Sequence, residues 1–227
     1  MTAHASAAAI ELLQNHSLTT LVQRELERRI VAGELRPGAK LNEEDIAGQL
    51  SVSRGPVREA FRALESMGLL RMEKNRGVFV RQVSLAEADE IYEVRAGMDA
   101  LVGRLLAARI TTPEVADLRE RLRQMREAAR ARSVEAYYPL NVAFHDRMAE
   151  LTGNRTLLAA YRRLVTELHL FRQEALANGP DSFPTSTREH SAIVDALARH
   201  DAEEAATLLY DHAIESRDRL HAARHAP

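Results

Sequence analysis

The chain has 227 residues, of which 45% are hydrophobic and 28% charged, and its formal net charge at pH 7 is −2. This ordinary balance predicts a folded globular protein, and the absence of cysteine excludes disulfides, thiolate metal sites and a cysteine nucleophile. No apolar run approaches the ~18 residues of a membrane-spanning helix, and the N-terminus lacks the basic start of a signal peptide. We therefore expect a soluble, cytoplasmic protein with no membrane partner.

The charge is unevenly divided along the chain. Residues 1–81 contain 12 basic and 10 acidic residues, whereas residues 82–227 contain 19 and 23. A negative total can conceal a basic face in the first part of the chain. The total charge therefore does not argue against a nucleic-acid partner.

Three short helices are predicted after an Ala-rich stretch, 1–16, that we expect to be a flexible N-terminal arm. In the first helix, within 19–33, apolar residues recur every three or four positions. The second (42–50) and the third (53–68) each begin with a residue type that commonly caps helices, Asn or Ser, and the third ends at a glycine. Their lengths and close spacing indicate a helix-turn-helix.

The pattern then changes to the alternation of a β-hairpin. Apolar and other residues alternate on both sides of Lys74-Asn75-Arg76-Gly77. This predicts a hairpin with a basic tip and a glycine that can adopt positive φ. Three short helices followed by such a hairpin predict that residues 17–81 form a winged helix-turn-helix DNA-binding domain.

The third predicted helix carries arginines on its outward face. Arg54 and Arg58 are four residues apart and share a face, and Arg62 continues the row, while the apolar residues face inward. Arginine can form two hydrogen bonds with guanine O6 and N7 or with a phosphate. An ordinary solvated arginine face is the alternative. Lys74 and Arg76 favour DNA contact, because a wing needs a basic tip to reach the DNA backbone or minor groove.

Several segments within 18–81 resemble the N-terminal domain of GntR-family bacterial transcription regulators. The segments are Ile30–Leu41, Ile46-Ala47, Val52–Phe61, Gly68–Leu70 and Arg76–Val80. The Ser-Arg-x-Pro-Val-Arg run is the most specific of these matches. The resemblance implies DNA contacts from Arg54, Pro56, Arg58 and the wing around Gly77. Glu44 stands where the family usually has an arginine, which implies that one phosphate contact is lost.

The chain after Gln82 is predicted to be helical throughout, which makes the protein mostly α. We expect residues 82–227 to form an antiparallel bundle of about six helices joined by short loops. Four helices are expected over 84–109, 112–131, 133–153 and 156–177, and two more at the capping boxes Ser186–Glu189 and Asp201–Glu204.

Three histidines, His145, His190 and His212, are predicted on the inward stripes of different helices, and Asn141 lies one turn before His145. Neutral imidazoles together with a side-chain oxygen suit a divalent first-row metal ion. The alternative is three separately satisfied core histidines. The residue pattern alone gives the two interpretations about equal weight.

This second part of the chain resembles the FCD effector-binding domain found in one branch of the GntR family. The segments are Glu90–Arg95, Asn141–His145, Gly153-Asn154, Glu189–Ile193 and Asp211-His212. In that branch an Asp or Asn and three His bind a metal, which implies that Asn141, His145, His190 and His212 hold a divalent ion such as zinc, nickel, manganese or iron. Because Asn141 replaces the commoner Asp, the implied ligand set is uncharged and attracts a cation less strongly.

Arg95 is predicted on the inner face of the first bundle helix, with Ile91 and Met98. A charge that points into an apolar bundle must be paired, because unpaired burial costs several kcal/mol. We expect Arg95 to bind the carboxylate of a small effector that also completes the metal shell. The alternative is a structural ion pair with Asp99 or Asp146.

Together these patterns predict a homodimeric, DNA-binding transcriptional regulator, and a repressor rather than an activator. Its bundle would bind a divalent metal and a small carboxylate metabolite that modulates operator binding. One rival is a metal-dependent enzyme with a three-His site and Glu150 as a base, although an enzyme has no use for a basic winged helix. Another is a constitutive DNA-binding protein with structural histidines, which metal content and ligand-dependent melting would distinguish.

Overall fold

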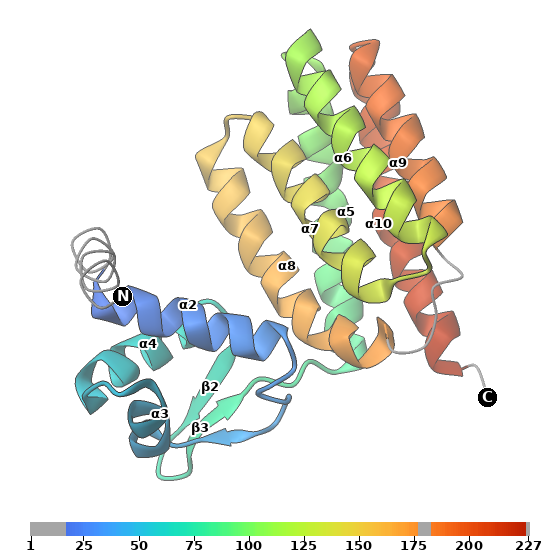
Figure 1. Ribbon diagram of the computed structural model, residues 1–227. Helices are drawn as coiled ribbons and strands as arrows, with labels where there is room; N and C mark the ends of the chain where they lie inside the picture. The colour runs from blue at the N-terminus through green and yellow to red at the C-terminus, as the bar shows by residue number, and fades with distance from the viewer. Residues whose placement is uncertain (1–16, 177–182, 226–227) are drawn as a thin grey trace. The chain divides into compact units, whose positions relative to one another are not determined.

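The computed structural model describes residues 17–176 and 183–225, and the chain divides into two compact units, Met1–Val83 and Ser84–Pro227 (Figure 1). This boundary lies two residues after the one expected from the sequence. The expected N-terminal arm, 1–16, lies outside the described residues. Both units are dominated by helices, so the mostly α fold class is confirmed.

The first unit contains three helices and a small sheet. The helices are α2 (Leu18–Val31), α3 (Glu43–Leu50) and α4 (Arg54–Ser66), and the strands are β1 (Lys40–Leu41), β2 (Leu70–Glu73) and β3 (Gly77–Val80). Their apolar faces form the core of the unit, where Leu26, Ile30, Phe61 and Leu64 are fully buried. The burial of these residues at three- and four-residue spacing explains why the periodicity predicted the helices.

The ends of these helices follow the sequence signals with one exception. The Asn42 side chain accepts a hydrogen bond of 2.8 Å from the backbone N–H of Glu44, which caps α3 as expected. Ser53 occupies the N-cap position of α4, but its side chain makes no capping hydrogen bond. The prediction that Ser53 caps α4 was therefore right about the position and wrong about the contact.

The predicted hairpin is present, and a third strand extends it. Strands β2 and β3 pair antiparallel with Arg71 opposite Phe79, and Gly77 has φ of +113° at the end of the turn. Strand β1 pairs antiparallel with the other edge of β3, with Lys40 opposite Phe79. The sheet order is therefore β1-β3-β2. The two residues of β1 were missed because such a short strand has no detectable alternation.

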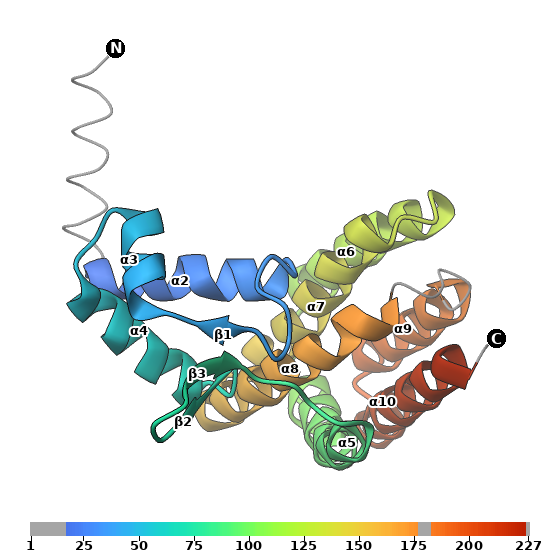
Figure 2. The same ribbon diagram turned by 90° about the horizontal axis from the view of Figure 1, so that it is seen from below.

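In its described residues the second unit is a bundle of six helices (Figures 1 and 2). They are α5 (Leu85–Ala107), α6 (Thr112–Arg130), α7 (Val134–Leu151), α8 (Arg155–Leu176), α9 (Phe183–Ala198) and α10 (Ala202–His225). The Ser84 side chain accepts a hydrogen bond from the backbone N–H of Glu87, and Asp201 does so from Glu204. These two predicted helix starts are confirmed.

The predicted capping box at Ser186 is wrong. Helix α9 begins at Phe183, so Ser186 lies inside the helix and is buried. Its hydroxyl accepts a hydrogen bond of 3.0 Å from the Tyr137 hydroxyl, and the Tyr137 ring stacks on Phe183 with centroids 4.1 Å apart. Packing of this aromatic pair adds a turn in front of the Ser–Glu signal, which local sequence alone could not reveal.

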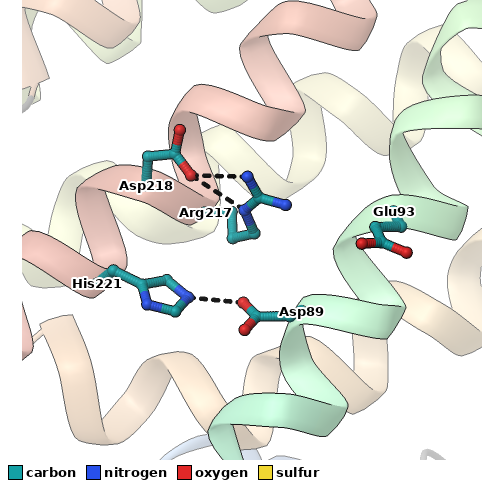
Figure 3. A pocket seen from close by; sticks show the side chains of 5 residues that line it. All are labelled: Asp89, Glu93, Arg217, Asp218 and His221. Carbon is teal, nitrogen blue, oxygen red and sulfur yellow. Dashed lines mark hydrogen bonds and ion pairs between the residues drawn. The ribbon is translucent and has the colours of Figure 1, made fainter.

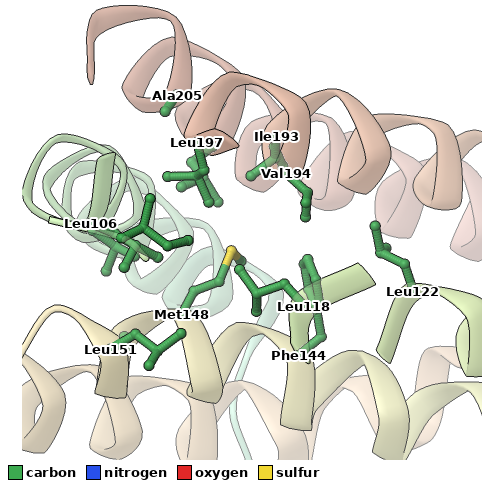
Figure 4. Close-up of a cluster of buried hydrophobic side chains, with 14 of the residues drawn as sticks. Leu106, Leu118, Leu122, Phe144, Met148, Leu151, Ile193, Val194, Leu197 and Ala205 are labelled. Atoms are coloured by element: carbon green, nitrogen blue, oxygen red, sulfur yellow. The ribbon is translucent and has the colours of Figure 1, made fainter. Parts of the chain in front are cut away.

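Buried side chains from several helices make one core for the second unit. Figure 4 shows Leu106, Leu118, Phe144 and Leu197, from α5, α6, α7 and α9, pointing toward one another, and all four are fully buried. This core fixes the inward faces of α7, α9 and α10, which carry the three histidines. No helix in the described part of the chain is long and apolar enough to cross a membrane.

Helices α5 and α10 lie side by side and antiparallel. Arg104 binds Glu203 near one end of the pair (Nε to Oε1, 3.0 Å), and His221 binds Asp89 near the other (Nε2 to Oδ1, 2.6 Å). Between these contacts the two backbones approach closely at Gly103. A Cβ atom placed there would lie 2.7 Å from backbone atoms of α10, so only glycine fits without moving a helix.

Candidate DNA interface and metal centre

Helix α4 presents its arginines to solvent while its apolar face is buried. The Arg54, Arg58 and Arg62 side chains are 59%, 49% and 63% exposed, and Pro56 in the first turn is half-buried. Side chains near the start of a recognition helix are those that reach base edges and phosphates. The structure therefore places the predicted arginines where DNA could reach them.

The hairpin tip is exposed as well. Lys74, Arg76 and Gly77 lie on the surface at or next to the β2–β3 turn. Arg76 forms an ion pair with Glu73, and its guanidinium carbon lies 5.9 Å from the centre of the Phe79 ring. These contacts keep the Arg76 side chain, which is 73% exposed, at the turn end of the hairpin.

An acidic residue at the start of α3 contacts two of the α4 arginines. The Glu43 carboxylate accepts hydrogen bonds from Arg58 Nε at 3.0 Å and from the Nη2 atom of Arg58 at 2.9 Å. A third contact, from Arg54, is 3.5 Å long. The guanidinium of Arg58, with a smaller effect from Arg54, holds the pKa of Glu43 below its usual value. Glu43 therefore stays ionised and occupies the donors of Arg58 that a phosphate or guanine would use.

In the second unit, His145, His190 and His212 come together from α7, α9 and α10. All three are buried, and the Nε2 atom of His190 lies 3.0 Å from that of His145 and 3.1 Å from that of His212. Two nitrogens bound to one ion at ~2.1 Å lie roughly 3.0–3.4 Å apart, for angles between a right angle and a tetrahedral one. The spacing of the imidazoles thus fits one shared ion.

His212 is oriented by a carboxylate on its far side. Its Nδ1 lies 2.6 Å from Glu189 Oε2, and Arg219 binds both oxygens of Glu189 at 2.8 and 3.0 Å. An ionised carboxylate only accepts hydrogen bonds, so the proton of neutral His212 belongs on Nδ1. The unprotonated Nε2 then faces the other two histidines. Carboxylate–histidine contacts of this kind orient the ligands of metal centres.

Burial keeps His190 neutral, as a metal ligand must be. Its pKa lies well below the ordinary value because the ring is fully buried, with further lowering by His212, Arg219 and Arg95. Asn141, one turn before His145 on α7, is also buried. The Oδ1 atom of Asn141 has no hydrogen-bond partner in the part of the chain that the structure describes. A buried, unsatisfied oxygen one helical turn before His145 fits a fourth ligand.

Arg95 is buried on α5 and pairs with Asp99, one of the two structural partners considered from the sequence. The Arg95 Nε to Asp99 Oδ2 distance is 3.1 Å, and both side chains are almost fully buried. Burial opposes its charge, but Tyr161, Asp99 and Tyr92 outweigh this and raise the pKa of Arg95, which stays protonated. The other considered partner, Asp146, binds Arg162 instead.

Comparison with known proteins places both units in one family. The family model described as "Bacterial regulatory proteins, gntR family" matches residues 18–80. The family model described as "FCD domain" matches residues 90–216. The chain belongs to the GntR family and carries an FCD domain. Its relatives are transcriptional regulators and not enzymes, so this GntR protein is a DNA-binding transcriptional regulator.

Named relatives and a solved structure agree with this assignment. The chain is 30% identical to a protein named "Probable D-xylose utilization operon transcriptional repressor" of Paenarthrobacter nicotinovorans, over 90% of this chain and 89% of that one. It is 31% identical to the Nta operon transcriptional regulator of Aminobacter aminovorans, over 80% and 84%. The structure of a GntR regulator from Rhodococcus sp. RHA1 matches with a TM-score of 0.77 and 29% identity, over 91% and 99%.

Two contacts of this GntR regulator were missed in the sequence. Glu43 and Arg58 are fifteen residues apart on different helices, so no local pattern links them. Glu189 was noted only as part of a motif and a capping box, because it precedes His190 and lies off the inward stripe of α9. An acidic residue next to a candidate ligand was the only available signal, and acidic residues are common on helix surfaces.

Proposed function

We propose that this GntR regulator represses transcription in the cytoplasm as a homodimer, and that a carboxylate metabolite bound beside a metal ion in the FCD domain weakens operator binding. The observation that carries the proposal is the buried cluster of His145, His190 and His212 in a domain that also buries the cation Arg95. Such a cluster lies in the same chain as an exposed arginine row. One unit would therefore sense the metabolite and the other bind DNA.

In this proposal Arg54, Pro56, Arg58 and Arg62 contact the major groove, and Lys74, Arg76 and Gly77 contact the backbone or minor groove. The exposure of the α4 arginines and of the hairpin tip supports these contacts. Operator sequences can be selected from a random duplex pool with the purified protein.

On the selected operator, Arg58→Ala should weaken binding by ~1–3 kcal/mol and reduce discrimination against mutated sites. Arg76→Ala should instead lower affinity evenly across sequences and make the salt dependence shallower, because a phosphate contact carries no sequence information. Operator affinity that is unchanged in both folded variants would exclude these DNA contacts.

The proposed metal ligands are His145, His190, His212 and Asn141, holding zinc, nickel, manganese or iron. The imidazole spacing, the Glu189–His212 contact and the unsatisfied Asn141 oxygen support this set. A bound ion would act as a Lewis acid that attracts a carboxylate. Elemental analysis of the purified and metal-reconstituted protein tests the site directly, since a protein that takes up no ion would return the histidines to a structural role.

Arg95 is the proposed partner of the effector carboxylate. The Nε atom of Arg95 lies 3.1 Å from Asp99 Oδ2 but makes no hydrogen bond in the described part of the chain, so this buried cation keeps a donor that a ligand could use. The names of the two relatives refer to different operons and do not point to one ligand. The proposed ligand class, a carboxylate, therefore rests on the buried charge of Arg95. A buried arginine forms strong charge-assisted hydrogen bonds with a carboxylate.

A neutral pair of substitutions separates this role from a structural one. Arg95→Ala alone would remove the cation that compensates the buried charge of Asp99, at a cost of about 3–5 kcal/mol. The double variant Arg95→Met/Asp99→Asn removes both charges, and it should keep its metal but lose the thermal shift caused by the carboxylic acid that shifts the wild type most. Asp99→Asn alone is the matched control and should retain that shift. A double variant that still responds would exclude Arg95 as the effector contact.

The homodimer follows from how such regulators read DNA. Two identical surfaces related by a two-fold axis match two half-sites of a palindromic operator. A ligand that binds one arrangement of the dimer more tightly shifts the spacing of the recognition helices toward one that fits the operator less well. Sedimentation at micromolar concentration tests the state, because a monomer on a non-palindromic operator contradicts it.

A further inference from the structure

Helices α5 and α10 carry most of the exposed large hydrophobic side chains in the described part of the chain. Four large hydrophobic side chains are exposed in the described residues, and three of them belong to this pair of helices. Val94 and Leu101 on α5 are 54% and 40% exposed, and Tyr210 on α10 is 44% exposed. The contacts Arg104–Glu203 and His221–Asp89 place Tyr210 between the two ends of the helix pair. Val94 and Leu101 are seven residues apart and therefore share one face of α5, and exposed apolar side chains grouped on one face mark an interaction surface.

The sequence of α5 is nearly symmetric about Gly97 on this face. Val94 lies three residues before Gly97 and Leu101 four residues after it, so both share its side of the helix. A Cβ atom on Gly97 would meet nothing within 4 Å, which leaves the backbone open to a close approach. A two-fold axis at Gly97 would place Val94 of one protomer against Leu101 of the other.

The charges along α5 favour this antiparallel arrangement. Before Gly97 the exposed or half-exposed charges are acidic and include Glu90, seven residues away, whereas Arg104 lies seven residues after it. At the acidic end, Asp89, Glu93 and Asp218 outnumber Arg217 around a hollow of about 450 Å³ that His221 also lines (Figure 3). The antiparallel arrangement brings Arg104 of one protomer to the acidic end of the other. A parallel arrangement would oppose like charges.

We propose that α5 is the centre of a two-fold interface between copies of this chain, with the helices crossing antiparallel at Gly97, Val94 against Leu101, and Glu90 against Arg104. This inference rests on the homodimer of the proposed function and identifies its surface. Arg104 keeps its own Glu203 as a neighbour, so the contact with the other copy adds to an existing pair. Isologous contact supplies every interaction twice.

A single introduced cysteine tests the position of the axis, because the chain contains no other. Helices packed ~8–10 Å apart, with Cα atoms ~2.3 Å from each axis, bring facing Cα atoms to about 3.4–5.4 Å, which overlaps the Cα–Cα range of a disulfide. Oxidised Gly97→Cys should therefore run as a covalent dimer in denaturing electrophoresis without reductant. Ala116→Cys, on the exposed face of α6, is the matched control and should stay monomeric there.

Charge reversal tests the register independently. In the Glu90→Arg variant, the introduced arginine of each copy faces Arg104 of the other, so the dimer contains two repulsive contacts. The variant should therefore raise the dimer dissociation constant about tenfold at low salt. The double variant Glu90→Arg/Arg104→Glu should restore the wild-type constant, which a merely structural role for either residue would not produce.

The outcomes separate the surface from the dimer itself. A wild type that is dimeric by sedimentation, whose Gly97→Cys variant does not cross-link and whose Glu90→Arg variant dimerises normally, overturns the α5 interface and leaves the homodimer intact. A wild type that stays monomeric at micromolar concentration overturns both. Cross-linking of Gly97→Cys, together with rescue by the double charge reversal, establishes the crossing point.

Discussion

Glu189→Gln tests whether the carboxylate behind His212 tunes the metal centre. The substitution keeps the shape of the side chain and removes the charge that accepts from His212 Nδ1 at 2.6 Å and from Arg219. A neutral amide holds the Nδ1 proton less strongly, so the Nε2 lone pair points less reliably toward the other imidazoles. Loss of such a partner lowers metal affinity about 10–100-fold.

This change in affinity can be converted into stability. At a metal concentration 100 times the wild-type dissociation constant, the ion stabilises the folded state by about 2.7 kcal/mol. For an affinity 10 or 100 times weaker, the same relation gives about 1.4 or 0.4 kcal/mol. The loss of about 1.3–2.3 kcal/mol corresponds to roughly 3–9 °C in melting temperature for a domain of this size.

The assay compares melting of the chelator-treated protein with and without added metal, for wild type, Glu189→Gln and His212→Ala. Glu189→Gln should show a reduced metal-dependent shift, and His212→Ala, which lacks a ligand, the smallest one. Metal-free melting of Glu189→Gln serves as the control for damage to the Arg219 contacts. A metal shift equal to that of the wild type in Glu189→Gln would show that the contact does not support the ligand, and the reasoning would fail.

Three further outcomes are expected. Glu43→Gln should increase DNA affinity and steepen the slope of log affinity against log salt by about 0.9 for each phosphate that Arg58 gains; weaker binding in filter or anisotropy titrations would instead mean that Glu43 positions Arg58. Burial lowers the pKa of His190 from 6.5, so below about pH 6.5 the unfolded chain binds a proton at this residue that the folded chain does not. Metal-free protein should therefore lose stability as the pH falls below about 6.5. In urea titrations between pH 6.5 and 5, the free energy of unfolding of His190→Gln should depend less on pH than that of the wild type. Gly103→Ala should destabilise the protein by ~1–3 kcal/mol in urea unfolding, because its Cβ meets the backbone of α10 at 2.7 Å. Gly48→Ala, whose Cβ meets open space, is the control and should not destabilise it. Equal stability of the two variants would contradict the close approach of α5 and α10.

The sequence by itself determined the elements and the identity of the candidate ligands. Spacing of apolar residues and capping signals located the helices of both units, because helices bury a stripe that repeats every 3.6 residues. The same stripe placed His145, His190 and His212 inward, and in the structure the Nε2 atom of His190 lies within hydrogen-bond distance of the Nε2 atoms of the other two. Alternation gave the hairpin, because side chains of a strand point to opposite faces.

Only the tertiary structure decided which groups touch across elements. The contact of Glu43 with Arg58, and that of Glu189 with His212, join residues of different helices whose relative rotation and height are set by the packed core. The start of α9 at Phe183 depended on the Tyr137 ring in the same way. Local sequence fixes a period and a face because backbone geometry is repetitive, whereas a contact between two helices depends on how many side chains pack at once.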